Sequence, residues 1–207
     1  MTNSSTSTAL RFRVLGDSLA AGVGCARADE TPGPRLAARL RASGREVDLS
    51  VLAVSGARSA DLAAQVRTAV ATGVDLALIV VGANDLIRFT APEVGARLLR
   101  DAVARLRAAG AEVVVATAPD LSVASPVPPA YRTLVSQVSG FYARAQAEAV
   151  TGAGGVVAPV GRDLAARFAA DPRLFSGDRF HPSAAGYALV VDALAPVLDA
   201  AAGRAAA

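Results

Sequence analysis

Short apolar runs alternate with amphipathic stretches along almost the whole chain, and this alternation is the strongest constraint on the fold. Several of the runs are rich in valine, leucine and isoleucine without a polar residue at every second position. That pattern is typical of parallel strands covered on both faces. The expected strands are 12–15, 47–54, 76–81, 113–117 and 155–160, and the expected helices are 34–43, 59–72, 92–109, 130–150, 162–169 and 183–201.

Strand–helix alternation predicts a three-layer α/β/α sandwich, in which right-handed crossovers join the strands of a parallel sheet. Five strands fit the flavodoxin-like order 2-1-3-4-5, although the alternation alone does not determine the order. A chain of 207 residues suits one compact core. We therefore expect one domain over 1–207, with residues 1–9 and about 201–207 frayed.

Composition excludes several classes of enzyme. All 21 basic residues are arginine, so no lysine can form a Schiff base or bind nucleotide phosphates in a P-loop. One cysteine and one histidine cannot supply the Cys/His ligand sets of structural zinc. Because no cluster of carboxylates indicates a magnesium site either, we expect no metal and no cofactor.

Charge and hydropathy give expectations about partners and location. The net charge is +3, but the arginines are scattered, so we expect no nucleic-acid partner. Residues 1–9 are polar and lack the basic-then-apolar order of a signal peptide. No apolar run has the length needed to cross a bilayer. The expected location is the cytoplasm, with no integral membrane segment; the oligomeric state is left open.

The loops at the carboxyl ends of the strands are where a sheet of this kind binds ligands. His181, the only histidine, is the obvious general base near neutral pH. It follows Asp178 by three residues, so the carboxylate can hold the imidazole Nδ1–H and leave Nε2 free to accept a proton. Ser18 leaves the first strand in the sequence Gly16-Asp17-Ser18, where its hydroxyl can project over the sheet edge. The alternatives are a structural histidine and an ordinary strand-exit turn.

Two further loops carry hydrogen-bond donors. Gly56 follows the second strand, where glycine lets a backbone N–H approach a developing oxyanion. Asn84 follows the third strand and can donate a side-chain N–H to the same oxyanion, although it also suits a turn or a helix N-cap. The joint pattern favours a catalytic site over separate structural roles.

In their order along the chain, these motifs resemble the GDSL-type, or SGNH, hydrolase family. The similarity covers the whole expected domain, through residues 16–19, Gly56, 82–85 and 178–181. The fold that the resemblance implies agrees with the alternating pattern.

The resemblance implies a role for each residue. Ser18 would be the nucleophile, His181 the base and Asp178 the group that orients the imidazole. The oxyanion hole would comprise the backbone N–H groups of Ser18 and Gly56 and the side chain of Asn84.

Apolar loops beside these residues indicate an acyl pocket of modest size. The side chains expected to line it are Leu86, Ile87, Phe89, Phe175 and Phe180, unless they only seal the edge of the sandwich. The expected function is hydrolysis of small-molecule esters with small to medium acyl groups, as in lipases, lysophospholipases and arylesterases. Two alternatives stay open: an acyltransferase or thioesterase with the same acyl-enzyme, and a non-catalytic ligand-binding domain on the same fold.

Overall fold

The computed structural model describes residues 9–158 and 160–205. Its strands form one sheet in the order β2-β1-β3-β4-β5, and every neighbouring pair is parallel. The strands are β1 (Leu10–Gly16), β2 (Val47–Val51), β3 (Leu76–Val80), β4 (Glu112–Ala116) and β5 (Val156–Val157). The predicted fold class and strand order are confirmed.

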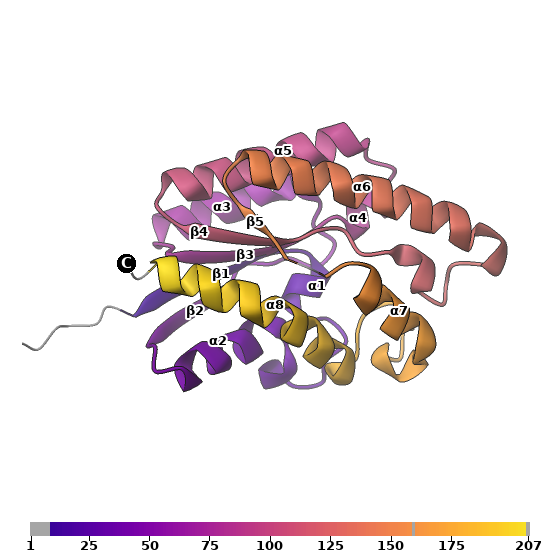
Figure 1. Cartoon of the computed structure of the whole chain (residues 1–207), viewed down its shortest axis with the longest axis horizontal. Coiled ribbons are helices and arrows are strands. Elements are labelled where there is room, and N and C mark those ends of the chain that lie inside the picture. The colour runs from indigo at the N-terminus through magenta and orange to yellow at the C-terminus, as the bar shows by residue number, and fades with distance from the viewer. Residues whose placement is uncertain (1–8, 159, 206–207) are drawn as a thin grey trace, which may run out of the picture.

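Helices cover both faces of this sheet (Figure 1). The α-helices are α1 (Ser18–Ala21), α2 (Pro32–Ala42), α3 (Leu62–Ala71), α4 (Ala83–Ile87), α5 (Pro92–Ala108), α6 (Arg132–Gly152), α7 (Arg162–Ala170) and α8 (Ala184–Ala205). Short 3₁₀ helices are η1 (Ala28–Glu30), η2 (Ser59–Asp61), η3 (Leu121–Val123), η4 (Pro129–Tyr131) and η5 (Pro172–Leu174). The single-turn helices α1 and α4 were not predicted.

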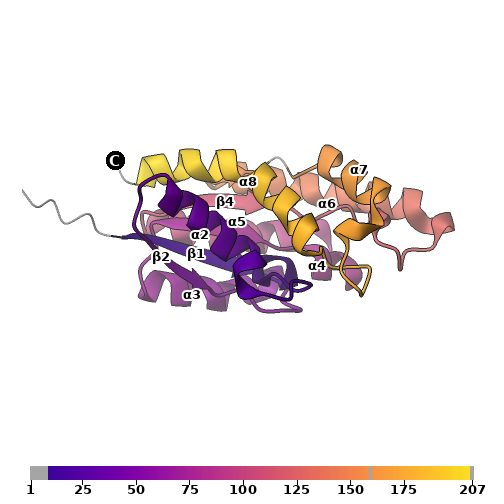
Figure 2. The same ribbon diagram turned by 90° about the horizontal axis from the view of Figure 1, so that it is seen from below.

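The sheet divides the core into two apolar clusters. On one face, side chains such as Phe12 and Leu78 pack against α2 and α8, which lie side by side in Figure 2. On the other face, side chains such as Leu15 and Ile79 pack against α3 and α5. The central strands β3 and β4 contribute side chains to both clusters, so their apolar residues run without alternation.

The two ends of the predicted pattern differ from the structure. The strand expected over 155–160 has only two residues in the ladder: the Gly155 N–H donates to Val150 at the end of α6, and residue 159 lies outside the described residues. Conversely, α8 continues to Ala205 where fraying was expected from about 201. Ala201 and Ala202 are buried against the sheet, which explains the longer helix. Residues 1–8 and 206–207 lie outside the described part.

By length and composition, α8 is the one helix in the described part of the chain that could cross a membrane. Its apolar residues have another explanation, because Leu194, Leu198 and Ala201 belong to the core cluster on one face of the sheet. The packing of α8 on β4 therefore accounts for its apolar composition.

Candidate active site

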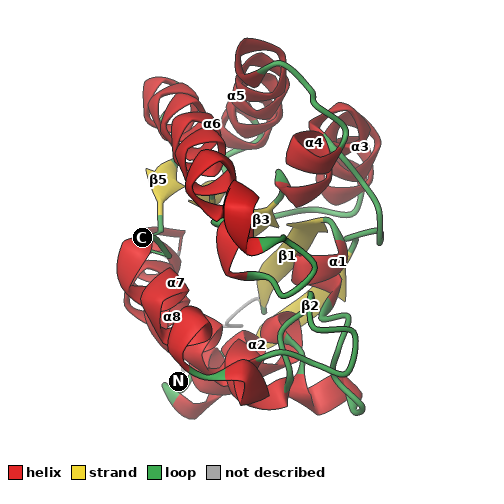
Figure 3. Cartoon of the chain, turned by 90° about the vertical axis from the view of Figure 1, so that its right-hand side faces the viewer, coloured by secondary structure: helices red, strands yellow, loops and turns green. Residues whose placement is uncertain are grey.

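The carboxyl ends of the strands lie at one end of the molecule, which faces the viewer in Figure 3. Ser18 follows β1, Gly56 follows β2 and Asn84 follows β3. His181 lies just before α8, which returns along the sheet from the same end. The topology thus gathers at one edge four residues that are far apart in the sequence.

Ser18 is the first residue of α1 and is only 5% exposed. Asp17 caps this helix, since its Oδ1 accepts the Leu19 N–H at 2.9 Å. Gly16 precedes the turn with φ +130°, and a Cβ there would lie 1.8 Å from the carbonyl oxygen of Val80. Glycine is therefore needed where β1 passes close to β3 and turns into α1.

The Asp17 carboxylate, next to Ser18 in the turn after β1, is fully buried. Burial raises the pKa of Asp17 to about 6, and the nearby Asp85 charge adds to the effect. A carboxyl with a pKa raised on folding contributes stability below its unfolded value of about 4, and this contribution is lost as the pH rises through about 6. At neutral pH the buried, ionised carboxylate of Asp17 lowers the stability of the fold. The hydrogen bond from the Leu19 N–H reduces this loss.

Ser18, His181 and Asp178 form a continuous hydrogen-bonded chain. Nε2 of His181 lies 2.9 Å from Oγ of Ser18, and Nδ1 lies 2.6 Å from Oδ2 of Asp178. The other oxygen of Asp178 accepts the N–H groups of Phe180 and His181, both at 2.9 Å, and the Ser176 hydroxyl at 2.8 Å. These bonds fix the carboxylate and, through it, the imidazole ring.

Asp178 is stabilised in its ionised form. Burial alone would raise its pKa, but hydrogen bonds from the His181 ring, two backbone N–H groups and a hydroxyl outweigh this and lower the pKa of Asp178 well below its usual value. An ionised carboxylate at Nδ1 favours the tautomer in which Nε2 faces the serine as a proton acceptor. The arrangement can therefore accept a proton from the Ser18 hydroxyl.

Three hydrogen-bond donors accompany the serine. The Asn84 amide donates one N–H to the Ala57 carbonyl at 3.0 Å, which leaves its second N–H for a ligand. Neither the Ser18 nor the Gly56 backbone N–H donates to another residue within 9–158 and 160–205. These groups suit the stabilisation of a developing negative charge on oxygen.

Asp85, which was not among the predicted site residues, joins two of these loops. Its Oδ2 accepts the Ser59 N–H at 2.9 Å and the Ser59 hydroxyl at 3.1 Å. This ties the loop that carries Gly56 to the start of α4, where Asn84 lies. Asp85 therefore positions donors, and its place beside Asn84 in the third motif is the sequence signal that could have indicated this.

Comparison with known proteins identifies the family. The model of the GDSL-like lipase/acylhydrolase family matches residues 14–189. The chain belongs to this family. It is 44% identical over 189 residues to a GDSL-like esterase of Mycobacterium tuberculosis, and the match covers 89% of the chain but only 60% of that relative. The predicted resemblance is thus confirmed.

Solved structures share the fold of this GDSL-family protein. The crystal structure of TesA superposes with a TM-score of 0.77 at 21% identity, covering 92% of this chain and 98% of that one. The psychrotrophic esterase EstA of Pseudoalteromonas, inhibited by monoethylphosphonate, gives a TM-score of 0.72 at 19% identity, covering 92% and 97%. At these identities the likeness concerns the α/β/α architecture.

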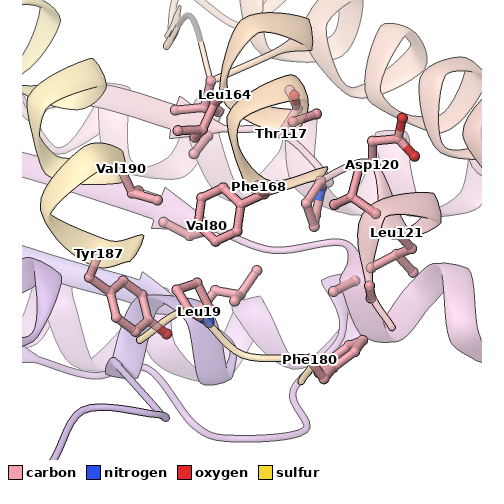
Figure 4. Close-up of a pocket in the computed structure, with 18 of the residues that line it drawn as sticks. Leu19, Val80, Thr117, Asp120, Leu121, Leu164, Phe168, Phe180, Tyr187 and Val190 are labelled. Atoms are coloured by element: carbon pink, nitrogen blue, oxygen red, sulfur yellow. The ribbon is translucent and has the colours of Figure 1, made fainter. Parts of the chain in front are cut away.

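An apolar cavity of about 120 Å³ lies beside Leu19 in this GDSL-family protein (Figure 4). Leu19, next to Ser18, and Pro182, next to His181, line it near the hydrogen-bonded chain. From there it extends between the sheet, α7 and α8. Its apolar lining includes Val80, Leu121, Leu164, Phe168, Tyr187, Val190 and Leu194.

The residues expected to line an acyl pocket divide into two groups. Phe175 and Phe180 line the cavity, and Phe175 packs edge-on against Phe168 with ring centroids 5.1 Å apart. Leu86, Ile87 and Phe89 do not line it, and Phe89 is 94% exposed. The α7 and α8 residues of the lining were not singled out from the sequence, because apolar side chains have the same helical periodicity whether they line a cavity or fill the core.

The described residues contain no group of three or more histidine, cysteine, aspartate or glutamate side chains that could hold a metal ion. The absence of a cofactor stays a prediction.

Proposed function

We propose that this protein is a serine esterase that hydrolyses carboxylic esters with small to medium acyl groups through an acyl-enzyme. The observation that carries the proposal is the position of His181, whose two ring nitrogens lie 2.9 Å from the Ser18 hydroxyl and 2.6 Å from the Asp178 carboxylate. Membership of the GDSL-like lipase/acylhydrolase family supports it.

The proposed reaction has two halves. Ser18 Oγ attacks the ester carbonyl while His181 Nε2 takes its proton, and Asp178 stabilises the imidazolium that forms. The imidazolium then protonates the leaving alcohol, which departs from the acyl-enzyme. In the second half, His181 deprotonates a water that attacks the acyl carbonyl, and Ser18 is regenerated as the acid leaves.

The oxyanion donors give a graded test. Asn84→Ala should lower kcat by about 10²–10³-fold, because one N–H would be lost from the oxyanion while the nucleophile and base remain. The measurement is kcat and KM for p-nitrophenyl butyrate, with a thermal melt, since Asn84 also bonds Ala57. A folded variant with kcat within threefold of the original would remove Asn84 from the proposed oxyanion hole.

The cavity supports binding of the acyl group. Each methylene transferred from water to an apolar site gains about 0.8 kcal/mol, or roughly fourfold in kcat/KM. We expect kcat/KM to rise from p-nitrophenyl acetate to the butyrate, and to fall for the palmitate once the acyl chain exceeds the length that the cavity holds. Equal values across these esters would contradict an acyl pocket.

Two valines, one in the cavity and one on the surface, allow a matched test of where the acyl group binds. Val190 lines the cavity from α8, whereas Val70 lies on α3 and is 42% exposed. Val190→Phe should fill part of the cavity and reduce kcat/KM for the octanoate relative to the acetate by about tenfold. Val70→Phe should leave that ratio unchanged. If both variants behave alike, the acyl group binds elsewhere.

A further inference from the structure

The first half of α6 carries an exposed apolar stripe and extends beyond the carboxyl ends of the strands (Figure 1). Leu134, Val138 and Phe141 follow one another at intervals of four and three residues, so they share one face of the helix. Leu134 is 58% exposed and Phe141 57%. Tyr131, 59% exposed, lies just before the helix at the same spacing. A globular protein normally buries such a face.

The end of α4, which contacts α6, adds two more exposed apolar side chains. These are Ile87 and Phe89, 47% and 94% exposed. Phe89 also has φ 53°, a left-handed conformation that is unfavourable for a bulky residue. A strained backbone that holds an aromatic ring in solvent suggests a function for that ring. We refer to Ile87, Phe89, Tyr131, Leu134, Val138 and Phe141 as the α4–α6 apolar surface.

Arginines outnumber carboxylates beside this surface. Arg88 precedes Phe89, Arg132 follows Tyr131, and the Arg144 guanidinium lies 5.9 Å from the Phe141 ring centroid. None of the three forms an ion pair with a described residue. The segment from Leu121 to Ala147 contains no aspartate or glutamate. The surface is therefore apolar with a cationic rim.

Carboxylates lie slightly farther from this surface in sequence: Glu93 follows Phe89 by four residues, Glu148 follows Arg144 by four, and Asp120 precedes η3. The Asp120 carboxylate is engaged elsewhere. It accepts the Ser136 hydroxyl at 2.7 Å. Ser136 is two residues from both Leu134 and Val138, so it projects from the opposite side of the helix. Asp120 therefore does not neutralise the cationic rim of the stripe.

We propose that the α4–α6 apolar surface docks the protein on an anionic lipid–water interface. Aromatic and aliphatic side chains would enter the acyl boundary, while the arginines contact anionic headgroups. A second copy of the chain is a poorer occupant, because a two-fold contact through this surface would bring like arginines together. Asn84 lies on the same α4, so docking would bring the site next to the lipid. The substrate class that follows, esters carried in a lipid phase, rests on the proposed function.

Vesicle co-sedimentation of the full chain tests the docking without reference to catalysis. Binding should be stronger to vesicles of phosphatidylcholine with phosphatidylglycerol than to phosphatidylcholine alone, and it should weaken at high salt. The Leu134→Ser/Phe141→Ser variant should bind the anionic vesicles at least about tenfold more weakly. Arg88→Gln/Arg144→Gln should lose about fivefold per arginine. Val70→Ser, an exposed valine on α3, should bind as the unmodified chain does.

Three results would overturn the proposal. The first is no binding of the unmodified chain to anionic vesicles, and the second is equal binding by the Leu134→Ser/Phe141→Ser variant. The third is a dimer in analytical ultracentrifugation that this variant abolishes, which would make the surface a contact between copies. Ser18→Ala should still bind vesicles, so a failed esterase assignment and a failed docking assignment give different patterns.

Discussion

Ser18→Ala should lower kcat for ester hydrolysis by about 10⁴–10⁶-fold while the protein stays folded. The substitution removes only Oγ, the atom that lies 2.9 Å from His181 Nε2. The helix cap survives, because Asp17 bonds the Leu19 N–H and not the Ser18 side chain. Turnover of p-nitrophenyl butyrate by the purified variant, together with its thermal melt, measures both expectations.

Covalent labelling separates catalysis from mere ligand binding. A fluorophosphonate probe should label the unmodified protein and the surface variant Ser43→Ala, but not Ser18→Ala. His181→Ala should lose activity to a similar extent, and the double variant should be little worse than either single one, since serine and base act as a unit. Ester turnover by Ser18→Ala within tenfold of the original would refute the nucleophile. Absence of labelling in the unmodified protein would favour a non-catalytic binding domain.

Much of the fold was predictable because burial on two faces leaves a direct mark on sequence. β3 is buried along its whole length and reads as an uninterrupted apolar run. The length of β5 was overestimated. β5 lies at the edge of the sheet, and only Val156 and Val157 pair with β4, so the apolar residues around them do not belong to the strand. α1 and α4 have no periodicity to detect, since each is about one turn long.

The site was predictable where chemistry restricts the residue type. Ser18 and His181 are 163 positions apart, and their contact could be expected because one histidine and a parallel sheet leave few alternatives. The cavity could not be derived in the same way. Proximity in sequence to Asn84 suggested Ile87 and Phe89, but the turn that ends α4 directs them outward.

Gly16→Ala should destabilise the fold by about 3–5 kcal/mol, a large part of the 5–15 kcal/mol typical of a domain. The added Cβ would lie 1.8 Å from the Val80 carbonyl oxygen, and the obstacle is backbone rather than a flexible side chain. Gln65 leaves little room for relief, because its amide bonds both the N–H and the carbonyl of Gly16, at 2.7 and 2.9 Å. Urea denaturation monitored by circular dichroism measures the loss.

Gly44→Ala is the matched control, because Gly44 also has a positive φ, +87°, but no atom lies within 4 Å of its added Cβ. It should lower the free energy of unfolding by only about 1–2 kcal/mol, the strain of placing alanine in the left-handed conformation. The difference between the two variants therefore isolates the close approach of β1 and β3 from glycine's backbone freedom. Equal losses would mean that the strands can separate at this point. In that case the turn that presents Ser18 would depend on its own hydrogen bonds rather than on the sheet.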